Sequence, residues 1–242
     1  MPIVDLHLHA AGVTDVGKRR RENQDSMVVR NDVCLWAVAD GMGGHQAGRW
    51  ASEQIKNALD ELPLSRDFDA DFRQISNAVH GANTTIAAES ERVGATIGST
   101  VAVLYGSESR FAIFWAGDSR VYLLRQGELV RMTTDHTQVQ EMVDEGLLTV
   151  EEAEMHPDRH VLSRAVGVGH KLTLDAMMGD IEPGDRFLLC SDGLTGVVTD
   201  AEIGEQLGAT APDPATRQLL DLVLSRNAPD NVTIIAVVYQ QR

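Results

Sequence analysis

Five aspartates lie where apolar, strand-like segments of the chain begin or end. Asp40 follows CLWAVA, Asp118 follows FAIFWAG and Asp192 follows FLLCS. Asp230 stands two residues before VTIIAVV, and Asp25 directly precedes SMVV. A single aspartate at such a position is usually a turn residue. Five of them favour one shared site, because packed sheets bring the ends of their strands together.

Several carboxylates at close quarters raise one another's pKa, and a hard divalent cation removes that cost. Carboxylates, backbone carbonyls and water suit Mg²⁺ or Mn²⁺, whereas a soft-metal site needs Cys or clustered His. Glycines stand at three of the four positions after Asp40. A backbone without Cβ can bend so that its own carbonyl faces an ion. We therefore predict that Asp40 and the carbonyl of Gly41 are metal ligands.

A pair of such cations, about 3.5–4 Å apart, shares a water molecule and turns it into a nucleophile near neutral pH. This chemistry hydrolyses phosphoesters without a covalent enzyme intermediate, and it needs a further group to hold the phosphate. Arg20 belongs to the basic run KRRR at 18–21 and lies five residues before Asp25. Because a guanidinium grips two phosphate oxygens at once, Arg20 is the predicted phosphate-binding residue.

The elements that must position these residues indicate an α+β layered fold. Apolar periodicity predicts amphipathic helices over 47–62, 71–89 and 214–227. Two long helices come early and mostly consecutive strands follow, which argues against a strictly alternating parallel sheet. Strands are expected at 3–10, 26–39, 98–105, 110–116, 120–125, 128–133, 172–178, 185–190 and 232–239.

Residues 136–165 interrupt the strands with two short helical patterns. Such an insertion is typical of a flap that faces a substrate, and equally of a structural loop with helical turns. The chain shows no repeat and no linker rich in Pro, Gly or Ser, so we expect one domain over residues 1–242.

Composition excludes several function classes. A net charge of −15 disfavours sequence-independent nucleic-acid binding. No apolar run approaches the ~18–20 residues of a membrane span, and the N-terminus lacks the pattern of a signal peptide, so we expect a cytoplasmic protein. A cysteine-type phosphatase needs Arg six positions after its Cys, but those positions hold Asp40 and Gly196 after Cys34 and Cys190.

Taken together, these residues resemble the metal-dependent Ser/Thr protein phosphatases of type 2C (the PPM family) in their compact bacterial form. The resemblance covers residues 14–237, with the motifs in family order. These are TDVGKRRRENQD (14–25), VADGMGGHQAG (38–48), GSTVAV (98–103), WAGDSRVYLLR (115–125), TTDHT (133–137), HPDRHVLSRAVG (156–167), FLLCSDGL (187–194) and APDNVTIIAV (228–237).

The resemblance implies a four-layer αββα sandwich, with two antiparallel β-sheets flanked by helices and a flap subdomain at about 136–165. It implies two Mn²⁺ or Mg²⁺ ions at one end of the sheets, with a third, weaker ion in bacterial relatives. Asp40 would bridge the first two ions. Asp192 and Asp230 would complete one site, and the Gly41 carbonyl the other. Asp118 would hold the third ion together with Asp192.

The resemblance also implies roles for three residues near the N-terminus. Gln24 and Asp25 would hydrogen-bond the metal-bound waters, and Arg20 would bind the substrate phosphate. Many relatives have Glu at the position of Gln24. Met42 stands where eukaryotic relatives place a His that is the suspected general acid. The proton would then come from metal-bound water near Asp118 or, as a second choice, from His45.

The implied function is hydrolysis of phosphoserine and phosphothreonine in proteins by direct attack of the water that bridges the ions. Phosphorylated proteins, including Ser/Thr kinases and their substrates, are the expected partners. The enzyme would oppose bacterial Ser/Thr kinases, with no nucleic acid and no membrane involved, and we expect a monomer.

Two alternatives come from different classes. A catalytically weak member of the family would bind phosphoproteins as a regulator without turning them over. A metal-dependent amidohydrolase would use His7 and His9, which are two residues apart on a strand and share a face. That fold needs regular βα alternation and further His ligands at later strand ends, where this chain has Asp followed by Gly.

Overall fold

The computed structural model describes residues 6–107 and 109–241. Its strands are β1 (Leu6–Asp15), β2 (Asp25–Arg30), β3 (Leu35–Met42), β4 (Gly98–Ser99), β5 (Val101–Gly106), β6 (Arg110–Ala116), β7 (Arg120–Arg125), β8 (Glu128–Arg131), β9 (Asp175–Asp180), β10 (Arg186–Cys190) and β11 (Val232–Gln241). Its helices are α1 (His45–Asp60), α2 (Phe68–Val93), α3 (Gln138–Asp144), α4 (Val150–Glu154), α5 (Asp192–Thr195), α6 (Asp200–Ala209) and α7 (Pro212–Ser225).

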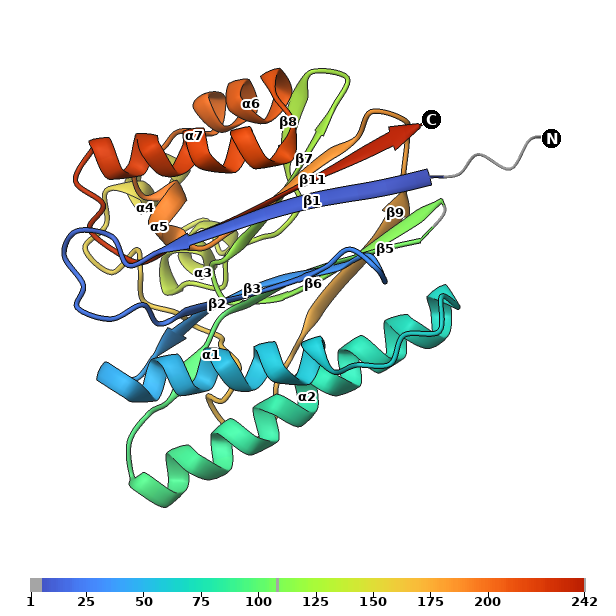
Figure 1. Cartoon of the computed structure of the whole chain (residues 1–242). Coiled ribbons are helices and arrows are strands. Elements are labelled where there is room, and N and C mark those ends of the chain that lie inside the picture. The colour runs from blue at the N-terminus through green and yellow to red at the C-terminus, as the bar shows by residue number, and fades with distance from the viewer. Residues whose placement is uncertain (1–5, 108, 242) are drawn as a thin grey trace.

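These elements form four layers (Figure 1). One sheet has the order β1-β11-β10-β7-β8, and the other has the order β2-β3-β5-β6-β9 with β4 paired to β3. All of the named strand pairs are antiparallel. Helices α6 and α7 cover the first sheet, and α1 and α2 cover the second. The predicted fold class is thereby confirmed.

Three apolar clusters fill the three spaces between the layers. Alternation along β3 shows how the sequence builds them: Trp36 and Val38 point between the sheets, whereas Leu35 and Ala37 point toward α1 and α2. Strands that are covered on both faces are apolar at nearly every position. Four packed layers therefore require the continuous apolar runs that the sequence shows, and the ends of those runs lie at the edges of the core.

The predicted strand over 26–39 is wrong, because the chain turns at residues 31–34 and forms the hairpin of β2 and β3. Asn31 and Asp32 were the turn signal within an otherwise apolar stretch. The helix α6 was not predicted. Its capping box, in which Thr199 and Glu202 each bond the other's backbone N–H, was the signal in the sequence.

The segment at 136–165 leaves and rejoins the body of the molecule at one place. The Gln138 N–H donates to the Val161 carbonyl at 2.9 Å, and the Ser163 N–H donates to the His136 carbonyl at 2.9 Å. Helices α3 and α4 lie between these closing bonds. The division of the chain into one catalytic domain with a flap stays a prediction.

Two glycines give a test of this packing. A Cβ at Gly41 would lie 2.0 Å from the Gly48 carbonyl oxygen in α1, whereas a Cβ at the exposed Gly81 in α2 would meet nothing within 4 Å. We expect Gly41→Ala to lower the free energy of unfolding by about 1–3 kcal/mol, since backbone must move. Gly81→Ala should raise it by about 0.4–1 kcal/mol. Urea unfolding checks both values, and equal stability of the two variants would contradict the packing.

Candidate metal centre

The five aspartates come from both sheets and lie at the same end of the sandwich. Asp25 and Asp40 are direct cross-strand partners in the β2–β3 pair. Asp118 lies in the turn between β6 and β7, Asp192 begins α5 directly after β10, and Asp230 precedes β11. Asp40 does not end its strand as predicted, because β3 continues to Met42 through pairing with β4.

These residues surround one cleft of about 1260 Å³. It runs between the loop at 19–24, the segment at 159–165 and the ends of the two sheets. Asp25 is buried behind the cleft with 8% of its surface exposed. The other residues predicted from the sequence all line it: Arg20, Gln24, Asp40, Gly41, Asp118, Asp192 and Asp230.

Asp25 joins the two sheets. Its Oδ2 accepts hydrogen bonds from the hydroxyls of Ser191 at 2.8 Å and Thr233 at 2.7 Å, both from the opposite sheet. Its Oδ1 is buried and has no hydrogen-bond partner among the described residues. Burial raises the pKa of Asp25 to about 6, against the effect of the two hydroxyls, and the charges of Asp192 and Asp230 add to the rise.

Asp40 is fixed through its backbone. Its N–H donates to Thr100 Oγ1 at 3.0 Å, and its carbonyl accepts from the Thr100 N–H at 2.8 Å and from the Ser99 hydroxyl at 2.9 Å. Burial raises the pKa of Asp40 well above its usual value, and the neighbouring aspartates raise it further. Burial followed by the charge of Asp192 raises the pKa of Asp118 to about 8.

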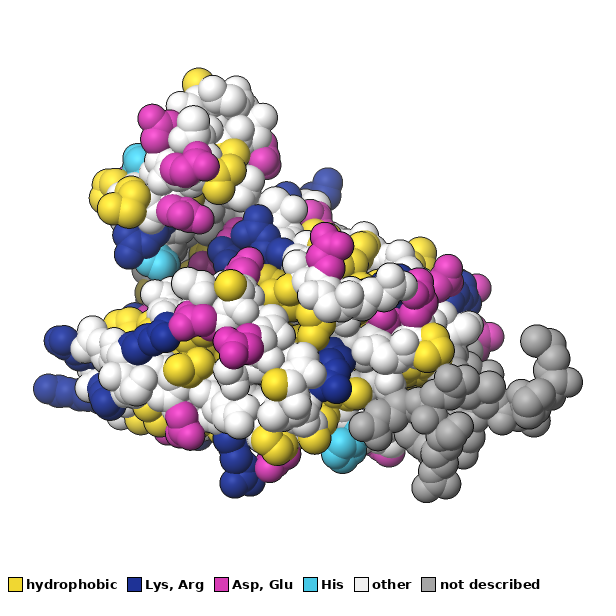
Figure 2. Space-filling model, turned by 90° about the horizontal axis from the view of Figure 1, so that it is seen from above, with side chains coloured by type: hydrophobic (Ala, Val, Ile, Leu, Met, Phe, Trp, Pro, Cys, Tyr) yellow, Lys and Arg dark blue, Asp and Glu magenta, His cyan; other side chains and the backbone are white. Residues whose placement is uncertain are grey.

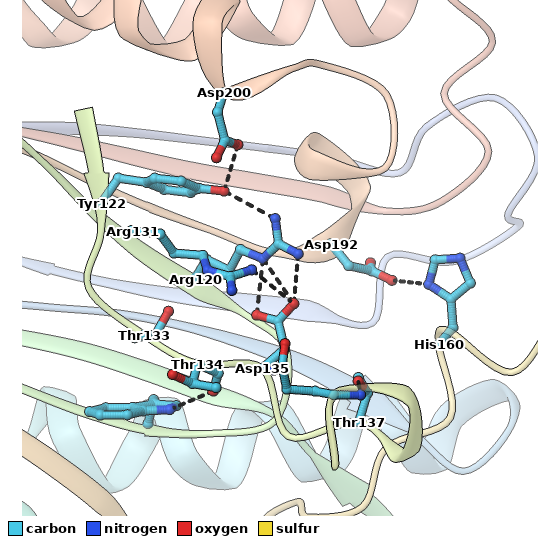
Figure 3. Close-up of polar contacts among 12 residues, drawn as sticks. Arg120, Tyr122, Arg131, Thr133, Thr134, Asp135, Thr137, His160, Asp192 and Asp200 are labelled. Atoms are coloured by element: carbon cyan, nitrogen blue, oxygen red, sulfur yellow. Dashed lines mark hydrogen bonds and ion pairs between the residues drawn. The ribbon is translucent and has the colours of Figure 1, made fainter. Parts of the chain in front are cut away.

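Like Oδ1 of Asp25, Oδ1 of Asp192 is buried and finds no hydrogen-bond partner in the part of the chain that the structure describes. Its Oδ2 lies 3.6 Å from Nδ1 of His160, which comes from the segment at 136–165 (Figure 3). One ligand atom each from Asp118, His160 and Asp192 lies within 4.8 Å of the others. Buried carboxylate oxygens without donors, beside carboxylates that raise one another's pKa, fit a site for hard divalent cations.

Gly41 lines the cleft, but the structure gives a different reason for a glycine there. The end of β3 and the first turns of α1 approach so closely that neither Gly41 nor Gly48 has room for a Cβ. The Gly41 N–H donates to the Gln24 carbonyl at 3.2 Å, which ties the end of β3 to the loop before β2.

Arg20 lies at the rim of the cleft and forms a bidentate ion pair with Asp230. Its Nε donates to Oδ1 at 2.8 Å, and an Nη donates to Oδ2 at 2.6 Å. This pair raises the pKa of Arg20. The guanidinium of Arg20 thus holds two oxygens of one acceptor, and its role as the phosphate-binding residue stays a prediction.

His160 was missed as a site residue, although the motif HPDRHVLSRAVG contains it. The sequence distance from His160 to the aspartates does not indicate a shared site, because only the folded segment at 136–165 brings His160 to Asp192. Met42, which stands where eukaryotic relatives would place a His, lines the cleft. The side chains of His45 and His7 lie outside the described ones, and His9 is exposed on the edge strand β1.

A second polar network, also missed, is built around Arg120 (Figure 3). Arg120 forms a bidentate ion pair with Asp135, at 2.6 Å for the shortest contact, and donates to the Tyr122 hydroxyl at 3.1 Å. Tyr122 in turn donates to Asp200 at the start of α6. This network joins the strand after Asp118 to the chain that enters the segment at 136–165.

Comparison with known proteins agrees with this geometry. A family model described as Protein phosphatase 2C matches residues 14–142. The serine/threonine protein phosphatase PstP of Mycobacterium tuberculosis is 39% identical over 237 residues, which cover 97% of this chain and 46% of PstP. The serine/threonine phosphatase stp of Listeria monocytogenes is 33% identical, with 95% of each chain covered.

Among solved structures, the catalytic domain of PstP in complex with two manganese ions superposes with a TM-score of 0.87 and 37% identity, covering 98% of this chain and 100% of that one. The chain spans about half the length of full PstP and nearly all of the Listeria relative. Fold, motifs and relatives confirm the family that the sequence predicted. The chain belongs to the protein phosphatase 2C family.

Proposed function

We propose that this chain is a metal-dependent protein phosphatase that hydrolyses phosphoserine and phosphothreonine. The observation that carries the proposal is the convergence of four carboxylates on one cleft, with Asp25 buried behind them and two buried oxygens that lack donors among the described residues. Arg20 at the rim of the same cleft supplies a phosphate-binding group. Family membership and the names of the relatives support the same function.

The cations are assigned to the floor of the cleft. Asp40, Asp192 and Asp230 with the Gly41 carbonyl would hold two ions, and Asp118 with Asp192 would hold a third. Bound Mn²⁺ or Mg²⁺ would polarise the phosphoryl group and lower the pKa of water to near neutral. Two manganese ions in the PstP catalytic domain support this assignment.

The protein's own residues orient the reactants. Arg20 is placed to turn its fork from Asp230 to two oxygens of the phosphate. Asp25 is held by Ser191 and Thr233, and with Gln24 it would orient water at the floor of the cleft. The contacts of Asp25 are set before the substrate arrives, so of these residues only Arg20 has to move when the phosphate binds.

The partners and setting form the finer part of the proposal. We infer that the substrates are phosphorylated proteins, including Ser/Thr kinases and their targets, and that the chain acts as a monomer in signalling. Among the described residues, no helix is both long and apolar enough to cross a bilayer. Cytoplasmic location stays a prediction from the sequence.

The direct test is hydrolysis of p-nitrophenyl phosphate and of a phosphothreonine peptide with Mn²⁺, repeated with EDTA. Turnover that EDTA abolishes supports the proposal. Binding of the phosphopeptide without turnover would instead favour the regulator that binds phosphoproteins. The amidohydrolase alternative has no support in the family match or in the fold.

Without cations, the thermal stability of the chain should fall as the pH rises. The pKa values of Asp25 and Asp118 rise from 3.8 to about 6 and about 8 on folding, so their protonation stabilises the folded state. That stabilisation is complete below pH 3.8 and is lost as the pH rises through those higher values. We therefore expect the Tm in EDTA to fall between about pH 5 and pH 8.5.

Saturating Mn²⁺ should raise the Tm most at the alkaline end, because the ion binds the folded, deprotonated site. Asp118→Asn should flatten the decline above about pH 6.5, whereas Asp32→Asn, at an exposed position, serves as the control. A Tm that does not respond to Mn²⁺ at any pH would contradict the assignment of a cation site.

Replacement of a floor carboxylate should separate chemistry from folding. We expect Asp192→Asn to lower kcat for p-nitrophenyl phosphate by about 10²-fold or more, because an amide is a poorer ligand for a hard cation. Thermal unfolding in EDTA should remain cooperative. Normal turnover by this variant would show that Asp192 holds no metal.

Arg20→Ala should act mainly on KM. Loss of a bidentate contact to a charged group corresponds to about 1.5–3 kcal/mol, or roughly tenfold to a hundredfold in kcat/KM for a phosphopeptide. Arg20→Lys should recover only part of this, since Lys is a point charge. An unchanged KM in Arg20→Ala would remove Arg20 from the phosphate site.

A further inference from the structure

The cleft carries more cations at its rim than the proposed chemistry uses. Arg19 and Arg21 flank Arg20 in the loop at 19–24, and Arg159 lines the same cleft from a separate segment, at 136–165. All three are exposed. Figure 2 shows a lobe that projects from the body, with Lys, Arg and His side chains gathered around the hollow at its base.

None of these three arginines forms an ion pair with a carboxylate in the part of the chain that the structure describes. Arg19 donates to the neutral side-chain oxygen of Asn227 at 3.1 Å, and Arg159 donates to the His156 carbonyl at 3.5 Å. Elsewhere arginines such as Arg49 and Arg125 are paired. The exposed Glu22 lines the same cleft, but three arginines without a carboxylate partner among the described residues leave net positive charge there, in a chain with 36 acidic and 21 basic residues.

A buried side chain, Asn231, holds both ends of the loop that carries Arg19 and Arg21, and the Lys18 N–H donates to the Ala228 carbonyl at 2.9 Å within it. Asn231, 4% exposed, donates from its Nδ2 to the Val16 carbonyl at 2.9 Å and to the Glu22 carbonyl at 3.0 Å. Its Oδ1 accepts from the Gln24 N–H at 2.8 Å. The backbone around the arginines is thus fixed at both ends, so ordering the loop adds little to the cost of binding.

We propose that these arginines select protein segments with acidic residues on both sides of the phosphorylated residue. The inference rests on the proposed function, because Arg20 and the floor of the cleft must hold the phosphate. An extended peptide advances about 3.3 Å per residue, so side chains two or three residues away lie about 7–10 Å from the phosphate. In this proposal Arg19 and Arg21 bind acidic residues on one flank of the peptide, and Arg159 binds those on the other.

The test compares two phosphothreonine peptides that differ only at the second and third positions on each side, Asp and Glu in one and Asn and Gln in the other. Each exposed ion pair contributes up to a factor of about five. We therefore expect kcat/KM with Mn²⁺ to favour the acidic peptide by about tenfold at low salt, through KM, and the preference to shrink in about 0.5 M KCl.

Variants of the rim locate the preference. The double variant Arg19→Gln/Arg21→Gln, and separately Arg159→Gln, should each reduce the ratio while turnover of p-nitrophenyl phosphate stays near that of the unmodified chain. Arg73→Gln is the matched control, because Arg73 is exposed on α2 and does not line the cleft. Arg21→Glu should lower the ratio further and improve a peptide with Lys at the same flanking positions.

The outcomes separate the two proposals. No turnover of p-nitrophenyl phosphate with Mn²⁺ would overturn the proposed function and the inference with it. Two results would overturn the inference alone, provided that p-nitrophenyl phosphate is turned over. One is a kcat/KM for the acidic peptide within about twofold of that for the neutral peptide. The other is a tenfold preference for the acidic peptide that none of the rim variants changes. Thermal unfolding of each variant shows whether it still folds. The charge-reversed variant Arg21→Glu is an independent check, because its preference should shift from the acidic peptide toward the peptide with Lys.

Discussion

Repulsion among buried carboxylates is the constraint on which the rest of this structure depends. The chain brings Asp25 and Asp40 face to face across one strand pair and adds Asp118, Asp192 and Asp230 around them. Burial, together with the charges of the neighbouring aspartates, raises the pKa of Asp25, Asp40 and Asp118 and makes the ionised site costly to fold. A chain that keeps this arrangement needs a counter-charge at the floor of the cleft and a scaffold rigid enough to hold the oxygens in place.

The scaffold meets that need through packing and through hydrogen bonds between the sheets. Three apolar clusters fix the four layers relative to one another, so the strand ends have little freedom. Thr100 holds the backbone of Asp40, while Ser191 and Thr233 cross from the other sheet to Asp25. The carboxylates are therefore positioned by elements whose stability comes from elsewhere in the molecule.

Acidic and basic side chains are partly separated in the cleft, with the exposed Glu22 as the exception among the arginines of the loop at 19–24. Carboxylates form the floor, and Arg20 lies at the rim, where its pair with Asp230 joins the two levels. Beyond it, the other arginines of the rim face solvent from backbones that Asn231 and the closing bonds at residues 136–163 hold in place. The phosphate group of a substrate would thus contact Arg20 and the floor of the cleft, whereas the neighbouring residues of the same peptide would contact the arginines at the rim.

The order of the motifs alone determined the family, the layered fold and the set of aspartates, because apolar runs that stop at Asp mark strand ends wherever they occur. Tertiary structure decided what depends on register and on long-range contacts. Three features follow from contacts between separate segments of the chain. Asp25 faces Asp40 across a strand pair, the end of β3 approaches α1 so closely that Gly41 is needed beside Gly48, and His160 reaches Asp192. The turn at 31–34 also escaped prediction, since both strands of its hairpin are apolar. Sequence spacing records the order of the segments, but only the packed sheets determine which side chains meet.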